Sequence, residues 1–252
     1  MKIEMNELRF RALAGGTELL EIGPVTMTIA EREFFTFIDA GFFGASAVLR
    51  MIGGLSAPSS GTIELVGATG RPKPAGLVFS SPLLLPWRTA LGNIMLNAEL
   101  RGEKSSETES RARWLLATVG LPHAAEAMPH ELSSADARRI ALCRALVPQP
   151  EVLLMDDLLQ GVDALARENL VADIQRLWIA GPVTTVLVTS QIWEAVMLSD
   201  RVAVMPAAPG EPLQIVPVEL LRPRRADKDT CPLIADYAGR IRTLMQSQGI
   251  LS

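Results

Sequence analysis

The chain has 252 residues, enough for one large domain with a hydrophobic core of its own. Hydrophobic residues make up 48% and charged residues 21%, which excludes disorder as a description of the whole chain. The net charge of −4 argues against a nucleic-acid partner, because proteins that bind nucleic acids are more often basic.

The mean hydropathy of +0.24 is high for a water-soluble protein. No uninterrupted apolar run approaches the roughly 20 residues that a membrane-spanning helix needs. The first ten residues, MKIEMNELRF, lack the basic start and apolar stretch of a secretion signal. We therefore expect a cytoplasmic chain with an apolar surface patch that a partner covers.

Cysteine and histidine are too few and too scattered to predict a metal centre. The chain holds Cys143, Cys231, His123 and His130, without the spacing of a zinc site. Cys143 lies in the apolar helical run IALCRALV, where a small buried hydrophobic residue is expected.

Predicted strands and helices alternate along the chain. Hydrophobic periodicity predicts strands over 21–30, 33–38, 61–67, 76–81, 151–157, 183–190 and 200–205. It predicts helices over 46–55, 104–122, 132–147 and 234–248, the third of them with Ser133 as N-cap. This alternation indicates an α/β fold with a largely parallel sheet.

Five segments stand in the order and spacing of one family. They are LLLPWRTALGNI, PHELS, PEVLLMDD, GVDALARENL and VPVELLRPRR. Together they resemble the ATP-binding subunit of an ABC transporter of the nitrate/sulfonate/taurine importer branch. The resemblance implies an ABC-type P-loop α/β fold with an N-terminal antiparallel β portion and a helical subdomain. It divides the chain into a discontinuous core (1–87 and 151–220), a helical subdomain (88–150) and a C-terminal tail (221–252).

The phosphate loop of that family is altered here. A working loop reads G-x-x-x-x-G-K-[ST]: backbone N–H groups surround the phosphates, the lysine reaches the outer ones and the hydroxyl holds Mg²⁺. In this chain Asp39 replaces the first glycine and Ala45 replaces the lysine, while Gly44 and Ser46 remain. Gly41 and Ala47 complete the altered loop. The missing cation and the added carboxylate argue against phosphate binding.

The family's other catalytic positions are also changed. By the resemblance, Asp156 occupies the position of the Mg²⁺-directing acid, and Asp157 that of the glutamate which polarises the attacking water. Ser46 and Asp156 would hold Mg²⁺ only if a nucleotide bound. Ser80 and Ser190 replace the family's glutamine and histidine. We therefore expect no functional catalytic residue in this set, and no resident cofactor.

The signature segment, at which the family binds the phosphate of an opposite subunit, reads Leu132-Ser133-Ser134-Ala135-Asp136. Its glycines are lost, and Asp136 adds a negative charge at the start of a predicted helix. Asp163 matches the aspartate of the family's D-loop. Both halves of a composite ATP site thus look damaged in this one chain.

The segment Leu85-Pro86-Trp87 falls where the family contacts its permease, so Trp87 is a candidate apolar anchor. Burial of Trp87 in the subdomain core is the plainer alternative. Phe10 could stack on adenine, but a core or surface phenylalanine is the safer interpretation. Arg222, Arg224 and Arg225 are interpreted as a solvated linker, with a partner site as the minor alternative.

Three functional hypotheses remain. The first is a catalytically degenerate ABC ATPase-like subunit, structural or regulatory, peripheral on the inner face of the membrane beside a permease and a second ATPase subunit. The second is a weakly active ATPase that binds ATP and Mg²⁺ and drives import of a small anion or organosulfur solute. The third is a soluble adaptor or sensor no longer bound to a transporter. The transported solute, and whether the second ATPase subunit is the same or a different chain, stay open.

Overall fold

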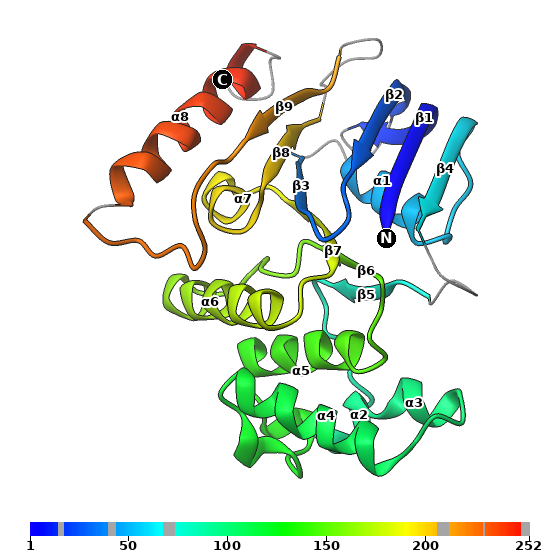
Figure 1. Ribbon diagram of the computed structural model, residues 1–252, viewed down its shortest axis with the longest axis vertical. Helices are drawn as coiled ribbons and strands as arrows, with labels where there is room; N and C mark the ends of the chain where they lie inside the picture. Colours follow the sequence, from blue (N-terminus) through cyan, green and yellow to red (C-terminus); the bar gives the residue numbers. More distant parts are fainter. Residues whose placement is uncertain (15–17, 40–43, 68–73, 206–211, 229, 248–252) are drawn as a thin grey trace.

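A computed structural model of the chain describes residues 1–14, 18–39, 44–67, 74–205, 212–228 and 230–247. Within them lie two β-sheets with helices around them, and a group of helices extends from one end (Figure 1). The predicted α/β class is confirmed, and among the described residues no helix is long and apolar enough to cross a membrane.

The smaller sheet is antiparallel and contains β1 (Lys2–Ala14), β2 (Glu18–Ile29) and β4 (Ser60–Val66), in the order β2-β1-β4. Ile3 of β1 pairs with Ile29 on one side and with Leu65 on the other. Phe10 is buried in the core beneath this sheet, as the safer interpretation had it.

The larger sheet has six strands in the order β5-β6-β7-β3-β8-β9. Their bounds are Gly76–Phe79 for β5, Val152–Asp156 for β6, Thr184–Thr189 for β7, Phe34–Ile38 for β3, Arg201–Val204 for β8 and Gln214–Pro217 for β9. All neighbours pair in parallel except β8 and β9. The carboxyl ends of five strands therefore lie at one edge, where α/β proteins place their ligand sites.

Helices cover both faces of the larger sheet, so its central strands are buried on both sides. Phe35 and Phe37 of β3 point toward α1 (Gly44–Ile52), which is packed between the two sheets. Phe34 and Ile38 belong to the core on the opposite face, with α6 (Ala164–Ala180) and α7 (Ile192–Leu198). This two-sided burial explains the mostly apolar run over 34–38.

The helical subdomain follows β5 (Figure 1). It contains α2 (Ala90–Ile94), α3 (Leu96–Leu100), α4 (Ser106–Thr118) and α5 (Ser134–Leu146), with short 3₁₀ turns at Pro122–Ala124 and Pro129–Glu131. Ser133 is the N-cap of α5, as predicted. Cys143 is fully buried, and burial raises the pKa of its thiol to about 12, which makes it an inert core residue.

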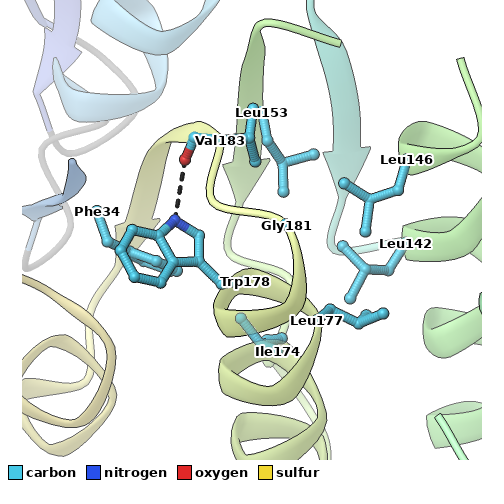
Figure 2. Close-up of a pocket in the computed structure, with 9 residues that line it drawn as sticks. All are labelled: Phe34, Leu142, Leu146, Leu153, Ile174, Leu177, Trp178, Gly181 and Val183. Atoms are coloured by element: carbon cyan, nitrogen blue, oxygen red, sulfur yellow. Dashed lines mark hydrogen bonds between the residues drawn. The ribbon is translucent and has the colours of Figure 1, made fainter. Parts of the chain in front are cut away.

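A small apolar cavity marks the place where α5, α6 and the larger sheet meet (Figure 2). Its volume is about 10 Å³, and Phe34, Leu142 and Trp178 are among its lining residues. The Trp178 indole N–H donates to the Val183 carbonyl at 2.9 Å. A lining this apolar offers a water molecule too few partners, so we interpret the cavity as a dry packing defect.

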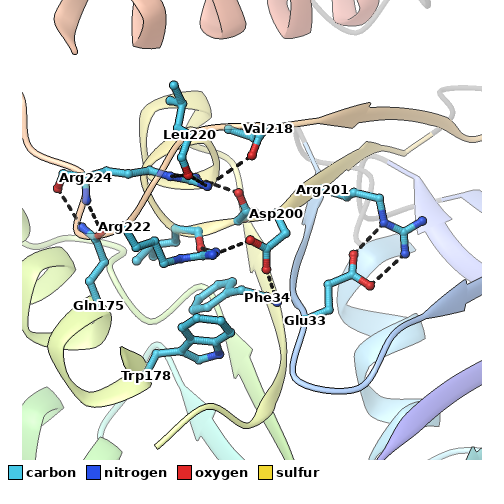
Figure 3. Close-up of polar contacts among 12 residues, drawn as sticks. Glu33, Phe34, Gln175, Trp178, Asp200, Arg201, Val218, Leu220, Arg222 and Arg224 are labelled. Atoms are coloured by element: carbon cyan, nitrogen blue, oxygen red, sulfur yellow. Dashed lines mark hydrogen bonds and ion pairs between the residues drawn. The ribbon is translucent and has the colours of Figure 1, made fainter. Parts of the chain in front are cut away.

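The solvated-linker interpretation is wrong for two of the three arginines of the C-terminal segment, Arg222 and Arg224 (Figure 3). Arg224 is buried and donates to the carbonyls of Val196, Ser199, Val218 and Leu220. Arg222 pairs with Asp200 and stacks over Trp178, with 4.4 Å from its guanidinium carbon to the ring centroid. These contacts attach the segment before α8 (Cys231–Ser247) to the body of the protein; Arg225 is exposed.

Candidate functional site

Four strand ends bring the predicted site residues to one edge of the larger sheet. Asp39 follows β3, Ser80 follows β5, Asp156 ends β6 and Ser190 follows β7. The Asp39 N–H donates to the Thr189 carbonyl at 3.2 Å, which continues the β3–β7 pairing for one more residue. Parallel pairing therefore assembles residues that lie far apart in sequence.

A carboxylate is bound to the first turn of α1. The backbone N–H of Ala45 donates to Asp39 Oδ2 at 2.9 Å, and both residues are buried. Gly44 is the first residue of α1 and is buried, while Ala47 packs against the core between the sheets. Gly41 lies outside the described residues. The turn that would face a phosphate in the resembled family thus contacts an acid of the same chain.

Ser46 and Asp156 form a direct hydrogen bond. The Ser46 Oγ donates to Asp156 Oδ1 at 2.6 Å, and both side chains are half-buried. A hydroxyl and a carboxylate are oxygen ligands of the kind that Mg²⁺ prefers. Even so, the described residues contain no group of three or more His, Cys, Asp or Glu placed to hold a metal ion.

Asp157 is held in an unusual backbone conformation just after β6. Its φ is +51°, in the left-handed region, and its N–H donates to the Val188 carbonyl at 2.9 Å. Burial raises the pKa of its carboxyl above the ordinary range, and the charges of Asp156 and Asp39 raise it further, against the opposing effect of Arg167. This edge of the sheet therefore concentrates negative charge.

Glu194 belongs to the same region and was missed by sequence reasoning. Its side chain on α7 is almost fully buried, it accepts the Thr189 hydroxyl at 2.5 Å, and one of its oxygens lies 3.5 Å from Nε of Arg167. Burial raises the pKa of Glu194 to about 7, while Thr189 and Arg167 favour the charged form. The only sequence signal was a lone acid inside the apolar run IWEAVML.

Two side chains of the signature segment, residues 132–136, form hydrogen bonds within the segment. The Ser133 hydroxyl accepts the Asp136 N–H at 3.1 Å and donates to Asp136 Oδ2 at 2.7 Å. The other Asp136 oxygen accepts from Arg139 at 3.0 Å. Leu132 packs against the core, while Ser134 and Ala135 form the first turn of α5. A carboxylate thus stands at this helix N-terminus too, where negative charge is favoured.

Asp163 is the N-cap of α6, with its Oδ1 accepting the Ala166 N–H at 2.9 Å. The structure therefore gives this residue a helix-capping role of its own.

Trp87 is not a core residue, so the plainer alternative is wrong: its side chain is 72% exposed. Leu83 is also exposed, Pro86 is exposed and Leu85 is half-buried. The loop is held by Asn93 of α2, whose amide nitrogen donates to the carbonyls of Leu85, Arg88 and Thr89 at 3.0–3.1 Å. The Leu85 N–H returns a hydrogen bond to Asn93 Oδ1 at 2.7 Å. The result is an ordered apolar protrusion.

Comparison with known proteins decides the family. A family model described as "ABC transporter" matches residues 23–160. An ABC transporter ATP-binding protein of Methanocaldococcus jannaschii is 32% identical over 239 residues, which cover 94% of this chain and 88% of that protein. The chain belongs to the ABC transporter ATP-binding family.

Relatives named for import systems point to one branch of that family. The nitrate import ATP-binding protein NrtC of Synechococcus elongatus is 35% identical over 94% of this chain, which spans only 37% of that longer protein. An aliphatic sulfonates import ATP-binding protein of Burkholderia lata is 38% identical over 79% of this chain and 60% of its own length. The chain is thus related to importer ATP-binding proteins.

Solved structures confirm the ABC ATPase fold, including its antiparallel sheet and helical subdomain. The dimeric structure of a bacterial ABC transporter cassette matches with a TM-score of 0.71 and 25% identity, covering 87% of this chain and all of that one. A post-hydrolysis dimer of that cassette bound to ADP and phosphate matches with a TM-score of 0.70 at 24% identity.

Proposed function

We propose that this chain is a catalytically degenerate member of the ABC ATPase family that acts as a structural or regulatory subunit of a nitrate- or sulfonate-type importer. It docks on an integral membrane permease, beside a second ABC ATPase subunit, on the inner face of the membrane. The observation that carries the proposal is the hydrogen bond from the Ala45 N–H to the Asp39 carboxylate.

The site does not fit a magnesium-bound triphosphate. Ala45 supplies no cation, and Asp39 already takes one of the N–H groups that would meet a phosphate. Two unit charges of the same sign repel by about 4 kcal/mol at roughly 4 Å and an effective dielectric constant of ~20. Asp157, with its raised pKa, and the serines at positions 80 and 190 offer no compensating positive charge. Hydrolysis by this chain is therefore expected to be negligible.

The signature side supports the same conclusion. Asp136 engages the Ser133 hydroxyl and carries a negative charge at the N-terminus of α5. That carboxylate would repel a phosphate that an opposite subunit presented to this helix N-terminus. The chain would therefore weaken a partner's site as well as lack its own, which suits a structural or regulatory role.

The docking surface we propose is the loop around Trp87. An exposed tryptophan beside the exposed Leu83 is the kind of apolar anchor that dominates protein interfaces. Because Asn93 holds the loop through four hydrogen bonds, little ordering entropy is lost on binding.

We propose that the chain divides into three parts. Residues 1–87 and 151–220 form the core, residues 88–150 form the helical subdomain, and residues 221–252 form the C-terminal tail.

One observation favours a second candidate, a weak but real ATPase. Ser46 and Asp156 keep a hydroxyl–carboxylate pair that could share a Mg²⁺ ion if a nucleotide bound. In that case Asp157 would be the acid next to the attacking water, one methylene shorter than the glutamate of the family.

Equilibrium binding of ATP, with and without Mg²⁺, separates the two candidates. Wild-type chain is expected to bind neither form, and the Ala45→Lys/Asp39→Gly double variant is expected to regain binding. An ordinary rate of Mg-ATP turnover that Asp156→Asn abolishes would refute the degenerate assignment and establish the second candidate.

Docking is tested by co-purification with detergent-solubilised permease. Trp87→Ala is expected to abolish the association. Trp114→Ala is the matched control, because Trp114 on α4 is also exposed, at 46%, but lies outside the loop. Equal loss in both variants would contradict docking through the loop around Trp87, and no association of wild type would favour a soluble adaptor.

A further inference from the structure

We propose that the Asp39 carboxylate is an intramolecular substitute for a bound phosphate, which holds the first turn of α1 in shape and closes it to anions from outside. The inference rests on the proposed function, because it says what occupies the first turn of α1 when ATP does not bind there. It also assigns a definite role to a residue that otherwise counts only as a defect.

The position of Asp39 meets the requirements of a phosphate oxygen. Its Oδ2 accepts the Ala45 N–H at 2.9 Å, at a turn whose N–H groups have no partner within the helix. Its negative charge stands at the N-terminal end of a nine-residue helix, where the helix dipole favours an anion. Its side chain is 9% exposed, so the contact is made away from bulk water.

The backbone of Asp39 is anchored independently of this contact. Its N–H donates to the Thr189 carbonyl of β7. The end of β3 therefore positions the Asp39 carboxylate, and the turn that donates to it belongs to α1. Both elements belong to the core between the two sheets.

A phosphate can be excluded from the first turn of α1 for two reasons: because Asp39 already accepts a hydrogen bond there, or because a lysine is missing. The two reasons lead to different expectations. An external phosphate would have to displace Asp39 from the Ala45 N–H and leave a buried carboxylate beside its own charge. Adding a lysine at position 45 would therefore not be sufficient, because the new ammonium group could pair with Asp39. Removing the carboxylate should open the turn to anions even without a lysine.

The experiment uses the full chain and inorganic pyrophosphate as probe, with sodium chloride of equal ionic strength as reference. Thermal unfolding and calorimetry are measured for wild type, Asp39→Gly, Asp39→Asn and Ala45→Lys. Wild type and Ala45→Lys are expected to show no specific response. Asp39→Gly is expected to bind pyrophosphate at least about tenfold more tightly than wild type, with a Tm increase of about 3 °C at ten times Kd.

Asp39→Asn distinguishes occupancy from charge. Its amide oxygen still accepts the Ala45 N–H, so we expect this variant to fold and to respond more weakly than Asp39→Gly. It also carries the test if Asp39→Gly fails to fold, since any specific pyrophosphate response above that of wild type supports the inference.

Glu33→Gln is the matched control. Glu33 stands at the other end of β3, is 8% exposed and also accepts a backbone N–H, that of Ala30 at 2.6 Å, while it pairs with Arg201 (Figure 3). This variant should lose stability without gaining a pyrophosphate response.

Three outcomes would overturn the inference while leaving the proposed function intact. These are folded Asp39 variants without a gain, a gain in Ala45→Lys alone, or an equal gain in Glu33→Gln. Mg-dependent ATP binding by wild type would instead overturn the proposed function, and this inference with it.

Discussion

Replacing Glu194 by glutamine is expected to remove a pH-dependent part of the free energy of unfolding. The Glu194 side chain is 2% exposed, accepts the Thr189 hydroxyl and lies beside Arg167. Burial raises the pKa of Glu194 from 4.5 to about 7 in the folded chain. The folded state therefore retains a proton that the unfolded state releases at lower pH.

The sign and size of the effect follow from proton linkage. Between pH 4.5 and 7 the folded state binds more protons, so the stabilisation present at low pH is lost as the pH rises through 7. A pKa difference of this size corresponds to about 3 kcal/mol. Glutamine does not titrate, so Glu194→Gln should lose this part of the pH dependence of the free energy of unfolding. The pH dependence that other groups contribute should stay unchanged.

The assay is denaturant unfolding of wild type and Glu194→Gln across this pH range and above it. The difference in free energy of unfolding between the two proteins cancels groups that titrate in both. This difference should change by about 3 kcal/mol between pH 4.5 and 7 and level off above pH 7. Thr189→Val should move the transition to higher pH, because it removes a hydroxyl that favours the charged carboxylate. Parallel stability profiles for wild type and Glu194→Gln would refute the reasoning.

Three further predictions concern stability. Gly61→Ala should lower the free energy of unfolding, measured with denaturant, by more than about 2 kcal/mol, because its φ is +79° and a Cβ would lie 2.4 Å from a carbonyl oxygen. Gly54→Ala is the control: its φ is +69° but the space around it is open, so it should cost only about 1 kcal/mol. Arg224→Ala should cost about 3 kcal/mol, because four carbonyls lose their donor and three of these hydrogen bonds are buried; a cost below about 1 in the same assay would contradict this. Asn93→Ala should lower stability by about 2–3 kcal/mol and weaken co-purification with a permease, whereas intact co-purification would show that the apolar loop does not depend on this residue.

Most of the fold was predictable from local pattern. The β-rich runs over 33–38 and 183–190 predicted strands, and the structure has them as β3 and β7. Ser133 was predicted as N-cap because hydroxyl residues before an apolar-periodic run have that role. The strand β9 was missed, since its four residues lie in a Pro-rich stretch without a clear period. Periodicity also failed to predict the helices α2, α3, α6 and α7.

The family was also readable from residue order, because a motif is defined by type and spacing. The same spacing predicts, without coordinates, that Ala45 occupies the position of the family's phosphate-loop lysine. The role of Asp39 did need them, because only the structure shows that its carboxylate accepts the Ala45 N–H of the chain's own backbone.

The sequence by itself determined the α/β fold class and the family, and it predicted which motif positions are substituted. Tertiary structure alone decided the exposure of Trp87, the burial of Arg224 and the raised pKa of Glu194. Each of these depends on which distant segments pack around a side chain, such as Thr189 and Arg167 around Glu194. Burial and charge environment are properties of that packing, and the residue type does not encode them.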